Sequence, residues 1–185
     1  MQIDIIEETG DQAPAAAFPP HGNFPDLREN PQAIAQIPSA RENPPLRTFL
    51  ATLNGPDAIF TTSSVAIKAD SPAAVAGGAA YEFASQVGIV FAIPSLNWER
   101  QHYADLCSGL KELLERDGSD ALRVALKISS CNFTAEKRSG FWLEVRLVAQ
   151  GNSAQQAELR WGLGLARIQQ ALLFSSRALK QQVGE

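Results

Sequence analysis

The chain has 185 residues, of which 45% are hydrophobic and 19% charged, and its net charge is −4. This length suits one hydrophobic core rather than two. It contains no apolar run of about 18 residues, which excludes a membrane-spanning helix, and its acidic start MQIDIIEETGDQ lacks the features of a secretory signal. Cys107 and Cys131 are too few for a disulfide framework, so we expect two buried thiols in a cytoplasmic protein.

The charges are unevenly distributed along the sequence. Residues 1–120 contain 16 acidic and 7 basic residues, whereas residues 121–180 contain 3 acidic and 9 basic residues. Such asymmetry is typical of contact with an acidic partner or with an acidic segment of the same chain. Because the basic third has no continuous basic run, an ordinary solvated surface is the favoured interpretation.

Residues 1–45 are rich in proline: eight of the eleven prolines lie within residues 9–45. Proline removes a backbone donor and favours extended conformations in its neighbour. We therefore expect an extended or disordered N-terminal arm, with MQIDII as an edge strand, ahead of a single domain over residues 46–185. Scattered apolar residues suit an arm lying across its own domain or a partner, and a plain tail is the alternative; they are Phe18, Phe24, Leu27, Ile34 and Ile37.

The first part of the domain predicts a short helix and a strand. Residues 44–55 begin with two prolines and end at Gly55, which is typical of a helix, and residues 58–70 are rich in Ile, Val and Thr. Residues 71–94 fit either a helix or the second strand of a hairpin. We favour the hairpin because Gly77 and Gly78 would weaken a helix, and a register with Lys68 opposite Glu82 and Phe60 opposite Val90 gives favourable pairs.

The second part predicts helix, hairpin and helix. Residues 97–118 carry one apolar stripe, with Asn97 as the expected cap. Residues 121–131 and 140–149 alternate like the two strands of a hairpin, with Lys127 opposite Glu144. Ser153 and Gln156 form a capping-box pattern at the start of a helix over residues 153–182. The whole order indicates an α+β fold, in which an antiparallel sheet of two hairpins has its helices packed on one face.

The last helix carries two apolar stripes, although a helix that covers a sheet needs only one. The first stripe contains Trp161, Leu165, Ile168, Leu172 and Leu179. The second contains Leu159, Leu163, Ala166, Leu173 and Phe174. The second stripe is therefore a candidate interaction surface.

We find no residue pattern that predicts catalysis. His21 lies in the proline-rich arm, His102 falls on the polar side of its helix, and no Cys or His spacing matches a metal site. The glycines of WGLGLAR lack the strand and third glycine of a dinucleotide loop. We therefore expect no catalytic residue, no cofactor and no metal, although a site assembled from distant residues would escape this search.

A protein-binding, assembly or adaptor function is the favoured interpretation. The segment NSAQQAEL…GLARIQQAL after an alternating strand resembles the C-terminal domains of flagellar hook-length and type III secretion specificity-switch proteins, but their proline and Leu-Gly element is missing here. The order of helices and hairpins is also similar to that of small acidic dimeric secretion chaperones. One alternative is a nucleic-acid-binding accessory protein that uses the basic third with Trp142 and Trp161 as stacking groups, and the other is an enzyme.

Trp142 lies on the polar side of its strand, beside Glu144 and Arg146. Its ring could lie on the outer face of the sheet across from Ser129 or Ala125, or the N-terminal arm or a second subunit could cover it. We favour cover by protein, in a homodimer. The predicted partner-binding residues are Trp142, Arg146, Leu159, Leu163, Leu173 and Phe174.

Overall fold

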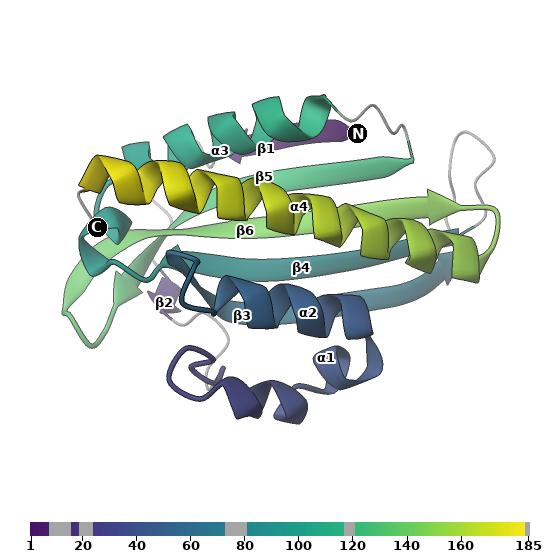
Figure 1. The fold of residues 1–185 in the computed structure, drawn as a ribbon, viewed down its shortest axis with the longest axis horizontal. Helices are drawn as coiled ribbons and strands as arrows, with labels where there is room; N and C mark the ends of the chain where they lie inside the picture. Colours follow the sequence, from purple (N-terminus) through teal and green to yellow (C-terminus); the bar gives the residue numbers. More distant parts are fainter. Residues whose placement is uncertain (8–15, 19–23, 73–80, 117–120, 184–185) are drawn as a thin grey trace.

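The structure is a computed structural model that describes residues 1–7, 16–18, 24–72, 81–116 and 121–183. Its strands are β1 (Gln2–Glu7), β2 (Ala16–Phe18), β3 (Phe60–Pro72), β4 (Tyr81–Phe91), β5 (Leu122–Phe133) and β6 (Arg138–Gly151). Its helices are α1 (Pro38–Glu42), α2 (Pro44–Leu53), α3 (Arg100–Glu115) and α4 (Ala154–Val183), with 3₁₀ turns η1 (Pro31–Gln36) and η2 (Pro94–Asn97). The predicted α+β class is confirmed, and α2, α3 and α4 cover one face of the sheet (Figure 1).

The sheet is mixed, so the prediction of a purely antiparallel sheet is wrong. Its strand order is β1-β5-β6-β4-β3, and β2 also pairs with β5. The β3–β4 and β5–β6 pairs are antiparallel as predicted, but β1 and β2 both run parallel to β5. The N-terminus therefore supplies the outer strand beside β5, as expected of MQIDII, and buries Ile3 in the core.

The β3–β4 pairing is present, but its predicted register is wrong. Phe60 lies opposite Phe91 and Lys68 lies opposite Ala84, one and two positions away from the predicted partners. The irregularity between Thr62 and Ser64 adds a residue to β3, so the offset is one position larger at Lys68 than at Phe60, and a second irregularity between Lys68 and Ser71 adds another residue beyond Lys68. The connection at residues 73–80 lies outside the described residues. In the other pair, Lys127 lies opposite Glu144 as predicted.

The core lies between the sheet and the helices. Trp161, Leu165, Ile168 and Leu172 of the first stripe are buried against β4 and β6, whereas Leu179 is half-buried. The Trp161 indole donates a 2.8 Å hydrogen bond to Ser85 Oγ. The predicted cap of α4 is confirmed, because the Gln156 N–H donates to Ser153 Oγ at 3.2 Å. The prediction that Asn97 caps α3 is wrong, since its side chain instead bonds both backbone groups of Phe91 and accepts from the Tyr103 hydroxyl.

Residues 24–43 carry η1 and α1 and pack on the same core as the rest of the chain, where the sequence predicted an extended or disordered arm. Leu27, Ala33 and Ile37 are buried in the cluster that also contains Leu46. The Arg28 guanidinium ties this segment to the start of β3 by donating to the carbonyls of Gly55, Ala58 and Phe60. Prolines open η1, α1 and α2, where the missing N–H of proline costs no hydrogen bond.

Within the described ranges, no helix combines the length and the hydrophobicity that crossing a membrane requires.

Candidate functional site

The structure places the predicted partner-binding residues on two opposite sides of the molecule. Trp142 and Arg146 belong to the outer face of the sheet, because Leu143, Val145 and Leu147 between and beside them point into the core. The remaining four residues lie on α4, which covers the other face (Figure 1). A single surface therefore cannot contain all six of them.

Trp142 is buried by its own chain, with only 7% of its surface exposed. It belongs to a small cluster on the outer face of the sheet, together with Val90, Cys131 and Phe133, and Trp98 packs against that cluster. The ring also lies over Gly88, where an added Cβ would come within 2.6 Å of it. Internal packing thus accounts for the tryptophan on the polar side of β6, and it leaves little of the ring for a second subunit.

Two pairs of polar side chains on the outer face bond to each other across β4 and β6. Gln86 donates to Glu144 across the β4–β6 pair at 2.5 Å, and Gln150 donates to Glu82 at 2.8 Å. Trp161 is fully buried on the opposite side of the sheet. Neither Trp142 nor Trp161 therefore presents a ring for stacking on a nucleic-acid base, which removes the aromatic part of that interpretation.

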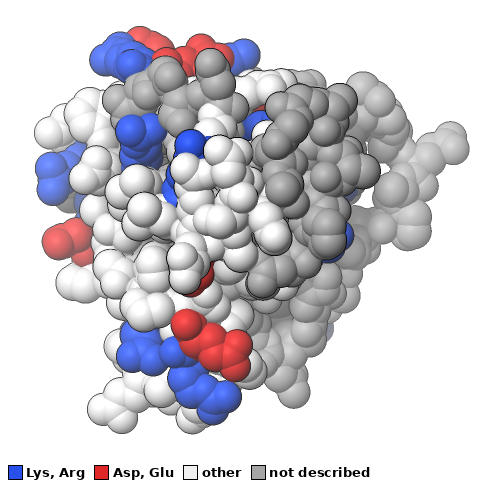
Figure 2. All heavy atoms as spheres, turned by 90° about the vertical axis from the view of Figure 1, so that its right-hand side faces the viewer, with Lys and Arg blue, Asp and Glu red and all other residues white. Residues whose placement is uncertain are grey.

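The second stripe of α4 forms a line of apolar side chains in solvent. Leu159, Leu163 and Phe174 are 68%, 57% and 61% exposed, and Ala166 between them is exposed as well. We call these four residues the α4 ridge. Leu173 is half-buried on the flank of the helix. At the end of the molecule where α4 begins, charged side chains lie at the top, the left and the bottom of the described surface, with mostly uncharged residues among them (Figure 2).

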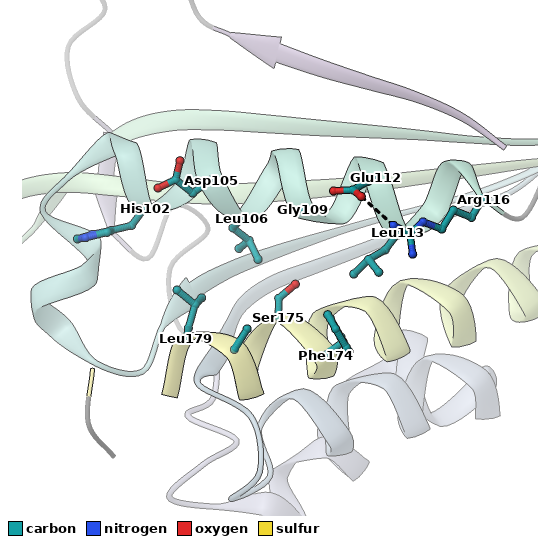
Figure 3. A pocket seen from close by; sticks show the side chains of 11 residues that line it. His102, Asp105, Leu106, Gly109, Glu112, Leu113, Arg116, Phe174, Ser175 and Leu179 are labelled. Atoms are coloured by element: carbon teal, nitrogen blue, oxygen red, sulfur yellow. Dashed lines mark hydrogen bonds and ion pairs between the residues drawn. The ribbon is translucent and has the colours of Figure 1, made fainter. Parts of the chain in front are cut away.

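A groove of about 480 Å³ lies beside the ridge, between α3 and α4. Leu106 and Leu113 of α3 and Leu179 of α4 point into the space between the helices, with Phe174 at its edge (Figure 3). The polar residues of the rim are engaged locally: Asp105 accepts from Gln101 at 2.7 Å, and Glu112 pairs with Arg116 at 2.7 Å. The groove is therefore apolar at its base and bounded by charges already paired along α3.

The polar groups at this groove do not form a catalytic arrangement. His102 Nδ1 lies 3.1 Å from the Leu96 carbonyl at one end of the groove, about three helical turns from Glu112 and about four from Arg116. His21 lies outside the described residues. Among the residues that the structure describes, no group of three His, Cys, Asp or Glu side chains could hold a metal ion.

Two buried groups of the described part of the chain have raised pKa values: Cys131, in the small cluster on the outer face of the sheet, and Tyr103, in the main core. Burial raises the pKa of the Cys131 thiol from 9.0 to about 12, so this cysteine is a neutral thiol at neutral pH. Burial also raises the pKa of Tyr103 well above its usual value. The Tyr103 hydroxyl donates to Asn97 Oδ1 at 2.6 Å, which fixes η2 against the start of α3.

Comparison with known proteins gives no further identification: no family model matches the chain, and neither the curated proteins nor the solved structures contain a match.

Proposed function

We propose that this is a non-catalytic protein that assembles with another polypeptide through the helical side of the molecule. The observation that carries the proposal is the α4 ridge. A large apolar side chain exposed alone is common on protein surfaces, but a line of them along one helix is typical of an interface. The adjoining groove between α3 and α4 offers a partner side chain an apolar pocket.

The exposed surface is large enough to contribute to binding. Complete burial of a Leu or Phe side chain stabilises by about 1.5–3 kcal/mol. With 57–68% of each side chain exposed, Leu159, Leu163 and Phe174 would each contribute about 1–2 kcal/mol when a partner covers them. Together the three side chains offset only part of the free energy that two molecules lose in translational and rotational freedom when they associate. A partner must therefore add apolar contacts of its own.

The charged residues beside the groove are better placed to select a partner by its charges than to catalyse a reaction. Glu112 and Arg116 are paired with each other on the solvent side of α3, where they can reorient toward charges on a partner. The order α2, β3–β4, α3, β5–β6, α4 is the order on which the resemblance to dimeric secretion chaperones depends. A secreted polypeptide is therefore one class of partner that this proposal includes.

The proposal can be tested by site-specific photo-crosslinking in the native host. A benzophenone amino acid replaces Leu163 on the ridge in one strain and Ile6 in another. Ile6 is a matched control because it is apolar and 44% exposed, but lies on β1. We expect a discrete protein adduct from position 163 that is lost when Phe174→Asp is added. Adducts that are the same from both positions, or none from position 163, would contradict the proposal.

A further inference from the structure

We propose that the groove between α3 and α4 receives an amphipathic α-helix of the partner polypeptide, with a large apolar side chain of that helix placed over Gly109. This inference rests on the proposed function and states what kind of segment the partner contributes. It is carried by the position of Gly109, by groove walls whose backbone groups are already bonded, and by the charges on the rim.

Gly109 leaves space in the middle of the groove that the fold itself does not use. At six of the seven glycines in the described part of the chain, an added Cβ would come within 4 Å of other atoms, whereas at Gly109 it would meet none. Glycine is, after proline, the least favourable residue inside a helix, so Gly109 weakens α3 without serving a contact among the described residues. It lies on the groove wall between Leu106 and Leu113 (Figure 3). The missing side chain therefore makes room for a group from outside the described chain.

The α3 wall has the spacing against which a second helix packs. Five of the seven α3 residues that line the groove recur at intervals of four and three positions, as in a coiled-coil seam; they are His102, Leu106, Gly109, Leu113 and Arg116. On the opposite wall, Ser175 and Ala178 of α4 are small as well. From residue 102 to residue 116 the wall extends about 21 Å, which is the length of a helix of about 14 residues. A helix of about four turns therefore fits along the groove, with one side chain between the small residues of both walls.

The chemistry of the groove favours a helix over an extended segment. Its walls are two helices, whose backbone N–H and C=O groups are bonded within each helix, and leucine side chains point into the space between them (Figure 3). An extended segment would bury its own N–H and C=O groups there without partners, which is costly, whereas a helix bonds these groups internally. A helix can therefore bury one apolar face in the groove and keep its polar face in water.

The charges on the rim favour basic residues on the flank of that helix. Asp105 and Glu112 lie about one turn on either side of Gly109 along the α3 wall. Glu112 is paired with Arg116, but the Asp105 carboxylate accepts from the neutral Gln101 side chain and has no ion pair with a described residue. A basic side chain one turn from the apolar group over Gly109 would neutralise Asp105. We therefore expect a partner helix with one apolar face and a basic flank.

Two synthetic peptides, titrated into the full chain by isothermal titration calorimetry, test the inference. The first is a stapled helix of about 14 residues, with leucines at intervals of three and four positions and lysines elsewhere. The second has the same composition in strict alternation, which is typical of a strand. We expect the helical peptide to bind at least about ten-fold more tightly than the alternating peptide. Equal affinities, or no binding of the helical peptide at about 1 mM, would overturn the inference.

Replacements on α3 show whether binding depends on Gly109. Gly109→Leu should weaken binding of the helical peptide about ten-fold or more because leucine fills the space, and it should not lower the thermal stability because leucine favours a helix. Ser108→Leu is the matched control, since Ser108 is exposed on the same helix and does not line the groove. Asp105→Lys should weaken binding several-fold through charge repulsion. An unchanged affinity in Gly109→Leu, with the circular dichroism of the wild type, would contradict the proposed position of the helix.

The inference and the proposed function can fail separately. A photo-crosslinked adduct at position 163 that Gly109→Leu leaves unchanged would show a partner on the ridge alone, which supports the proposed function and overturns the inference. Self-association of the chain that Gly109→Leu abolishes would show that a second copy fills the groove, and it would overturn the assignment to a partner helix. If neither an adduct nor peptide binding is found, both are overturned.

Discussion

Trp142 and Gly88 form a packed pair on the outer face of the sheet, and a double-mutant cycle measures how strongly they depend on each other. The Trp142 ring lies over Gly88, where an added Cβ would be 2.6 Å from a ring carbon and would also collide with Ser64 Oγ. Carbon atoms prefer a separation of about 3.5–4.0 Å. The neighbouring Val90, Cys131 and Phe133 limit how far the ring can retreat.

The single changes should both destabilise. Trp142→Ala removes a large buried ring from a cluster that cannot close over the space, so we expect a loss of about 3–4 kcal/mol in the free energy of unfolding. Gly88→Ala in the wild-type chain should cost about 2 kcal/mol through overpacking.

The double variant shows how strongly the effect of one replacement depends on the other. In the Trp142→Ala background the contact with the ring is removed, whereas the close contacts of the added Cβ with Ser64 Oγ and Ser63 Oγ remain. Gly88→Ala should therefore destabilise less than it does in the wild-type chain, with a coupling of about 1–2 kcal/mol. Urea unfolding followed by far-ultraviolet circular dichroism measures all four proteins without depending on tryptophan fluorescence.

Gly109 provides the control for this cycle. It lies inside α3, where an added Cβ would meet no atom within 4 Å, so Gly109→Ala should stabilise by the same amount, about 1 kcal/mol, in both backgrounds. If Gly88→Ala has the same effect in both backgrounds, or if Trp142→Ala costs less than about 1 kcal/mol, the described packing of Trp142 is wrong.

Three further predictions concern buried polar groups. Asn97→Ala should lower the free energy of unfolding by about 2–4 kcal/mol in thermal or urea unfolding, because Phe91 and Tyr103 lose their partners, whereas an effect below about 0.5 kcal/mol would contradict the network. Burial raises the pKa of the Cys131 thiol from 9.0 to about 12 in the folded protein, so the contribution of this thiol to the free energy of unfolding should be fully present below pH 9 and be lost as the pH rises from 9 to 12. Cys131→Ala should flatten the dependence of the free energy of unfolding on pH in that range. Ser63 Oγ is a buried oxygen without a hydrogen-bond partner in the described structure, so Ser63→Ala should stabilise by up to about 1 kcal/mol, and a clear loss in urea unfolding would reveal a partner.

Much of the fold could be predicted because its signals are local. The alternation of β5 and β6 fixes which side chains enter the core and leads to the observed pairing of Lys127 with Glu144. The double stripe of α4 likewise predicts one buried and one exposed line, and the structure shows both. In each case the evidence lies within a few turns or one hairpin of the residue concerned.

The predictions from the sequence that were wrong concern features that depend on distant or irregular contacts. A single β3–β4 register could not be predicted because the pairing changes twice along β3, at irregularities that no distinctive sequence marks. Prolines in residues 31–45 suggested an extended arm, whereas they begin helices there. The burial of Trp142 depends on Val90, Cys131 and Trp98, which come from separate parts of the sequence, so no local pattern could show that its own chain covers it.

The parallel pairing of β1 with β5 has a consequence for the order of events during synthesis. β1 pairs with residues that are made about 120 positions later. At about 5–20 residues per second, β1 must wait roughly 6–24 seconds before its partner exists. During that interval its isoleucines are available to chaperones, so β1 can join the sheet only after β5 has been made.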